Sequence, residues 1–67
     1  MTPNRLRRVI RTLREARGLT QRDLADKAKV TGAYVAQLET GTKKNPSLDV
    51  LKRLARALGV PVTELLE

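Results

Sequence analysis

The chain has 67 residues, of which 40% are hydrophobic, and its 14 Lys and Arg against 7 Asp and Glu give a formal net charge of +7 at pH 7. This length allows one domain with a single small core, and the absence of Cys leaves no disulfide or thiolate metal site to support that core. Without His, a glycine-rich loop or metal-ligand spacing, the sequence argues against an enzyme and predicts no cofactor. The excess of cations predicts an anionic partner, with nucleic acid first, and the lack of Cys fits a reducing cytoplasm.

A first helix is expected over 5–17, ended by Gly18. Its apolar residues recur at the spacing of one helical face: Leu6, Val9, Ile10 and Leu13. Six arginines accompany them against one acid, and we interpret most of these cations as a solvated surface. An alternative, a basic amphipathic anchor for anionic lipid or a transit peptide, is disfavoured because the apolar stripe is needed for the core.

The segment 21–40 indicates two short helices joined by a tight turn. Thr20 can cap the first helix and Thr31 the second, which ends at Gly41. Within each half the apolar residues lie three or four apart: Leu24, Ala28, Val30, Val35 and Leu38. The two helices would therefore share a buried face and leave the outer face of the second free to enter a groove, as in the helix-turn-helix that reads DNA.

After a loop at 42–46, Ser47 is expected to cap a fourth helix that Gly59 closes. Its inward-facing residues are predicted to be Leu48, Leu51, Leu54, Ala55 and Leu58. Pro61 is expected at the first position of a short last helix. This end of the chain is more apolar than a short helix can hide, which predicts an exposed patch suited to a twofold partner: Val62, Leu65 and Leu66.

From about Leu6 to Leu66 the chain resembles the Cro/CI-type (XRE-like) helix-turn-helix family of phage and bacterial repressors. Four pieces in the family's order carry the resemblance: LREARGLTQRDLA, VTGAYVAQLETG, NPSLDVLKRLARALGV and PVTELL. The resemblance implies an all-α, five-helix, lambda-repressor-like domain over 1–67, with its helix-turn-helix at about 21–40. It also implies a regulator, more often a repressor than an activator, that binds a near-palindromic operator as a dimer in a bacterial, archaeal or phage-infected cell.

The third helix is the expected reader of DNA, with Gly32, Ala33 and Tyr34 leading into the groove. The resemblance places Gly32, Ala33 and Gln37 at base-facing positions. The Gln37 amide can pair bidentately with adenine or contact guanine less specifically. Gly32 and Ala33 offer only close backbone approach and thymine-methyl contact, which favours shape-dependent recognition. Two interpretations of Tyr34 stay open: partial packing on the helix surface, or a phosphate or base contact.

Phosphate contacts are expected on both sides of the third helix. Gln21 begins the second helix, whose exposed amides favour an anion, and the matching glutamine of the family contacts the DNA backbone. The remaining phosphate candidates are Arg14, Thr31, Thr40, Lys43 and Lys44. By resemblance, Arg14 should also pair with Glu39 and anchor the third helix, a task that suits a bidentate arginine.

Lys29 occupies the turn position where the family usually has glycine, so a left-handed backbone is expected there. Its side chain is either a tolerated surface lysine or a phosphate contact.

Two further functions remain as alternatives. A protein-interaction or antitoxin-like module with a repressor-like fold would use the same helices for another ligand. RNA binding fits the charge, but the chain has a single aromatic residue and so lacks platforms for stacking bases.

Overall fold

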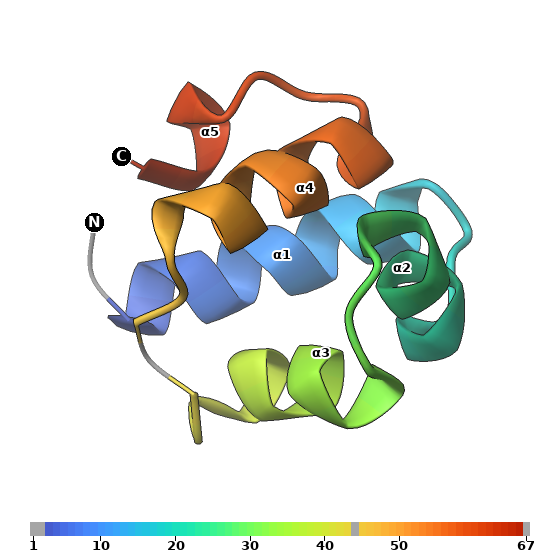
Figure 1. Cartoon of the computed structure of the whole chain (residues 1–67), viewed down its shortest axis with the longest axis horizontal. Helices are drawn as coiled ribbons and strands as arrows, with labels where there is room; N and C mark the ends of the chain where they lie inside the picture. The colour runs from blue at the N-terminus through green and yellow to red at the C-terminus, as the bar shows by residue number, and fades with distance from the viewer. Residues whose placement is uncertain (1–2, 44, 67) are drawn as a thin grey trace.

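The computed structural model describes residues 3–43 and 45–66 of the chain, and these form five α-helices with no strand. In chain order the helices are α1 (Pro3–Ala16), α2 (Gln21–Ala28), α3 (Gly32–Thr40), α4 (Leu48–Leu58) and α5 (Thr63–Leu66). In Figure 1, α1 crosses the centre, α4 and α5 lie on one side of it, and α3 lies on the other side with α2 at the end. The all-α, five-helix prediction is confirmed. Among the described helices, none has the length and apolar character that crossing a membrane requires.

Local signals in the sequence fix the ends of α2, α3 and α4. Thr20 and Asp23 form a reciprocal capping box, in which the Thr20 hydroxyl accepts from Asp23 N at 3.0 Å and Thr20 N donates to Asp23 Oδ2 at 2.9 Å. Thr31 and Ser47 cap α3 and α4 without a reciprocal bond, each accepting one backbone N–H. Each such cap is worth about 1 kcal/mol. These starts agree with the sequence prediction.

The core is built from aliphatic side chains of all five helices. Leu6 and Ile10 of α1, Leu24 of α2 and Leu38 of α3 are at most 2% exposed. The other buried residues of the helices are Ala25, Ala28, Val35, Leu51, Leu54, Ala55, Leu58 and Leu65. Because each fully buried leucine or isoleucine side chain stabilises the fold by about 1.5–3 kcal/mol, this cluster is the main source of stability in a chain without disulfides.

Two helix starts and the burial of Leu48 differ from the sequence prediction. The first helix extends back to Pro3, since proline is compatible with a first helical turn. Leu48, expected to face inward, is 53% exposed, because it is the first residue of α4 and projects beyond the core. The last helix begins at Thr63 rather than Pro61, whose carbonyl instead accepts Glu64 N in the turn before α5.

Candidate nucleic-acid interface

One side of α3 is buried and the opposite side is open. Val35 and Leu38 are 0% and 1% exposed, whereas Ala33, Gln37 and Thr40 are exposed. At Gly32 an added Cβ would meet no atom within 4 Å, so nothing in the described chain covers the start of the helix. The exposed side chains of α3 are thus uncharged and available to a partner.

A bidentate ion pair fixes α3 against α1. Arg14 Nε lies 2.6 Å from Glu39 Oε2, and Arg14 Nη2 donates to Glu39 Oε1 at 2.9 Å. The third Arg14 donor, Nη1, reaches the Leu19 carbonyl oxygen at 2.7 Å. The two side chains are only 12% and 4% exposed, and the hydrogen bond to Glu39 raises the pKa of Arg14. The pair implied by the resemblance is therefore present, and it joins α1, the turn before α2 and the end of α3.

Gln21 belongs to the same network. Its Nε2 donates to Glu39 Oε1 at 3.3 Å, and the side chain is half-buried at the start of α2. Arg14 and Gln21, both expected at phosphates, thus position α3 in the free protein. Their contact with phosphate remains a prediction.

The loop after α3 folds back on the helix. Lys43 N donates to the Gln37 carbonyl at 3.0 Å, and Lys43 Nζ lies 5.8 Å from the centre of the Tyr34 ring. Thr40 Oγ1 donates to the same Gln37 carbonyl at 3.3 Å and lies 3.1 Å from Thr42 Oγ1. Lys43 is therefore held over α3, next to the half-buried Tyr34. Lys44, also predicted at phosphate, lies outside the described residues.

The turn between α2 and α3 has the expected left-handed backbone, with φ 59° and ψ 45° at Lys29. Sequence reasoning missed the neighbour that supports this turn: Arg53 of α4, whose Nη1 donates to the Lys29 carbonyl at 3.2 Å. It also assigned no role to Lys27 and Arg56, which line a hollow together with Lys29 and Arg53. Residue spacing along the chain could not reveal this cluster, because its members come from two helices that approach only in the fold.

The predicted dimer patch needs a correction at Leu65. This side chain is 0% exposed and belongs to the core, because α5 turns it inward between α1 and α4. Val62 is half-buried, and Leu66 is 36% exposed. Only Val62 and Leu66 remain available to a partner.

The helix-turn-helix family profile matches residues 10–65. The regulator DdrOP3 of Deinococcus deserti is 43% identical over 58 residues, which are 87% of this chain and 44% of that protein. The immunity repressor of Bacillus phage phi105 is 41% identical over 84% of this chain and 38% of the repressor. The chain thus spans less than half the length of these curated relatives.

Solved structures of similar size share the fold. The restriction-modification controller protein C.AhdI of Aeromonas hydrophila superposes with a TM-score of 0.86 at 36% identity, over 91% of each chain. The biofilm regulator SinR, solved in complex with DNA, gives a TM-score of 0.88 at 31% identity, over 92% of this chain and 98% of that one. The similarity therefore covers more than nine-tenths of the chain.

Proposed function

The chain belongs to the Cro/CI-type (XRE-like) helix-turn-helix family, and from this premise we propose that it regulates transcription by binding duplex DNA with α3 in the major groove. Repression is the proposed outcome, since an immunity repressor is among its relatives. The partner is a near-palindromic operator bound by a dimer, and the place of action is the DNA of a bacterial, archaeal or phage-infected cell.

The observation that carries this proposal is the open outer face of α3 on a rigidly held helix. The Arg14–Glu39 pair fixes the helix at its end, and the Thr31 cap fixes its start. A reading helix must present its base-facing side chains in one orientation, because specificity depends on hydrogen bonds of fixed geometry. A helix with small uncharged residues at its exposed start can also approach base edges closely.

Within this proposal, Gln37 supplies the polar base contact and Ala33 a methyl contact to thymine. Gly32 allows close approach of the backbone. Lys43 exchanges the Tyr34 ring for a phosphate, since a charged phosphate attracts an exposed lysine more strongly than an aromatic ring does. Thr31, Thr40, Gln21 and Arg14 complete the proposed phosphate contacts, with Arg14 acting mainly through its hold on Glu39.

The test is selection of bound duplexes from a random library, followed by binding of the selected site to Gln37→Ala. We expect the substitution to cost about 1–3 kcal/mol and to relax specificity at one base pair of each half-site. Thr12→Ala, at an exposed position of α1, is the matched control and should leave affinity unchanged. Selection of no preferred sequence, or no duplex affinity at any salt concentration, would favour the protein-interaction alternative instead.

A further inference from the structure

A second charged surface lies away from α3. One hollow of about 340 Å³ lies between Arg17, Lys27 and Arg56, with Leu19 and Ala57 in its lining. A second hollow, of about 190 Å³, is bordered by cations that include the same Lys27 and Arg56. We call the cations that border the two hollows the basic surface: Arg17, Lys27, Lys29, Arg53 and Arg56. No acidic residue lines either hollow.

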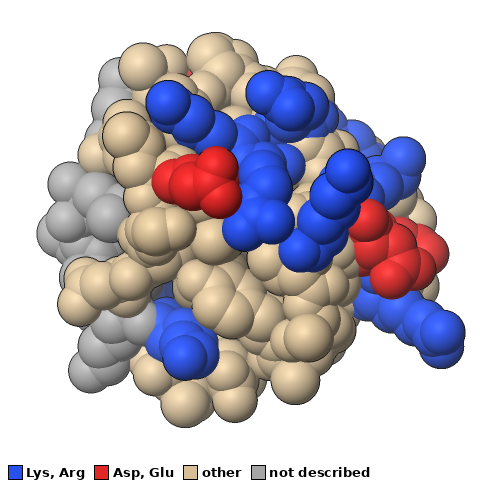
Figure 2. Space-filling model, in the orientation of Figure 1, with Lys and Arg blue, Asp and Glu red and all other residues tan. Residues whose placement is uncertain are grey.

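The basic surface is separate from the proposed reading face. In Figure 2, blue cations gather over α4 and α2, whereas the lower part of the molecule, where α3 lies in Figure 1, is mostly uncharged. A duplex seated on α3 would therefore leave this cluster unused. Its charge calls for a different explanation.

Structural roles account for only part of the cluster. Lys27 and Arg56 lie in the last turns of α2 and α4, where a cation complements the helix dipole by about 0.3–1 kcal/mol. Arg53 donates to the Lys29 carbonyl and lies 3.4 Å from Asp49 Oδ2. Lys29 ends α2 and shares this dipole benefit, but it also occupies a left-handed backbone that costs about 1 kcal/mol, and it adds a like charge to its neighbours.

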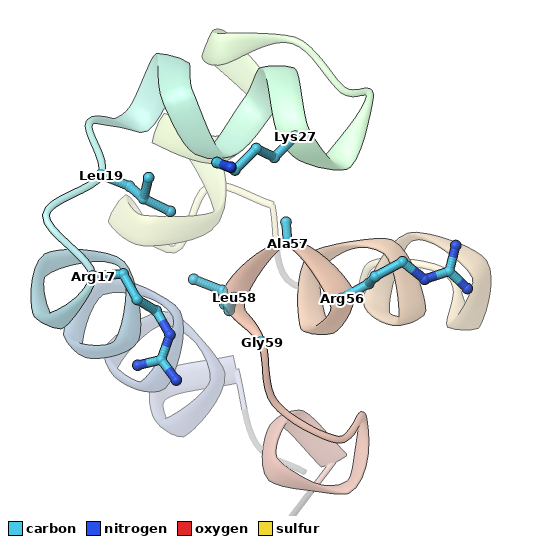
Figure 3. A pocket seen from close by; sticks show the side chains of 7 residues that line it. All are labelled: Arg17, Leu19, Lys27, Arg56, Ala57, Leu58 and Gly59. Atoms are coloured by element: carbon cyan, nitrogen blue, oxygen red, sulfur yellow. The ribbon is translucent and has the colours of Figure 1, made fainter.

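The arrangement of the cations selects the type of ligand. In Figure 3 the side chains of Arg17 and Arg56 extend in different directions, and Lys27 approaches the hollow from α2, so the charges surround the hollow rather than converge in it. A small anion would meet one charge at a time, whereas an extended chain would pass several. A duplex is too thick to enter either hollow. Single-stranded nucleic acid relies on aromatic stacking, and the chain's one aromatic residue, Tyr34, lies on α3.

We propose that the basic surface binds an acidic segment of a partner protein. Carboxylates of that segment pair with Lys27, Lys29 and Arg56 along the rim, and its apolar side chains contact Leu19 and Ala57, which are half-buried. The proposal does not depend on DNA binding, because the two surfaces use different residues.

The test uses the full chain and a short dye-labelled peptide of interleaved glutamate and leucine, measured by fluorescence anisotropy at low salt. We expect the double variant Lys27→Gln, Arg56→Gln to weaken peptide binding about tenfold, since each rim pair is worth up to about 1 kcal/mol. The matched control, Arg8→Gln with Arg11→Gln, removes the same charge from exposed positions of α1 and should change affinity less than about twofold. All four positions are exposed, so both proteins should fold, which circular dichroism checks.

Three results would overturn the proposal. Equal losses of peptide affinity in the two double variants would mean that the net charge of the protein alone attracts the peptide. Displacement of the peptide by inorganic triphosphate at equal concentration would point to a small polyanion as the ligand. Displacement by a selected duplex would place the peptide on the α3 face. Failure to find a selected duplex, by contrast, would affect only the proposed function.

Discussion

Lys29 adopts backbone angles, φ 59° and ψ 45°, that suit glycine better than any residue with a Cβ. Its N–H is satisfied by the Ala25 and Asp26 carbonyls, as in a normal helix end, so the geometry belongs to the turn and not to the side chain. The turn dictates the angles, and the lysine tolerates them.

Replacing Lys29 by glycine should therefore stabilise the fold. Removal of the left-handed strain is worth about 1 kcal/mol, which in a domain of this size raises Tm by about 4–8 °C. Thermal unfolding followed by circular dichroism measures the change. Lys29→Ala removes the charge but keeps the Cβ, so it should give little of this gain. An alanine variant as stable as the glycine variant would mean that repulsion between cations, not the backbone, limits stability at the turn.

Asp23 makes the capping box sensitive to acid. The Thr20 backbone N–H, and then hydrogen bonding with the Thr20 side chain, lower the pKa of the Asp23 carboxyl below its ordinary value. Because the pKa is lower in the folded state, the ionised Asp23 carboxylate stabilises the fold. This stabilisation is fully present above the ordinary aspartate pKa and is lost as the pH falls through the lowered value. Asp23→Asn keeps an oxygen acceptor but does not titrate, so its Tm should fall less between neutral and acidic pH than that of the wild type. Parallel Tm–pH curves for the two proteins would count against this role.

Among the helices, α3 depends most on one contact made outside it. Arg14→Ala would remove the ion-pair partner of Glu39, whose side chain is 4% exposed in the intact pair, and breaking a poorly solvated pair from one side costs about 3 kcal/mol. We expect a large loss of stability, measured by urea unfolding, together with a loss of DNA affinity because α3 is no longer held in place. In a domain of this size the loss is a large part of the total free energy of unfolding.

A double-mutant cycle separates the pair from the packing of Arg14. In a Glu39→Gln background, Arg14→Ala leaves no carboxylate without a partner, so it should cost clearly less than in the wild type. Equal costs in the two backgrounds would show that the arginine stabilises α3 by its stem and its bond to Leu19 alone.

The sequence determined the elements better than it determined their contacts. Caps placed the starts of α2, α3 and α4, and glycines placed the ends of α3 and α4, because these signals act over a few residues. Leu48 and Leu65 were wrongly assigned, since helical periodicity states which residues share a face but not how far the neighbouring helices extend along it. The resemblance supplied the Arg14–Glu39 pair, which spacing could not. The pairing of Lys43 with Tyr34 and of Arg53 with the Lys29 carbonyl depends on the path of loops, for which no local signal exists in the sequence.

For the molecule as a whole, charge and apolar surface are distributed over different faces. The basic surface covers the ends of α2 and α4, the open side of α3 is nearly uncharged, and Leu66 of α5 leaves an apolar side chain 36% exposed. The residues proposed for DNA, for a second copy of the chain and for an acidic partner are thus three different sets on one small domain.

The proposed dimer predicts how DNA binding depends on salt. With about four phosphate contacts per subunit, a dimer should bind its operator with a log–log salt slope near −7, and a monomer with a slope near −4. Leu66→Gln should shift the protein toward the monomer in analytical ultracentrifugation and give the shallower salt slope. Its Tm should be almost unchanged, because the Leu66 side chain is already partly exposed to water. Leu65→Gln is the contrasting variant: a polar group at a 0% exposed position should unfold the domain rather than only separate its copies. A wild-type protein that stays monomeric both free and on DNA would contradict the dimer, since two reading helices could not then be set about 34 Å apart on a palindrome.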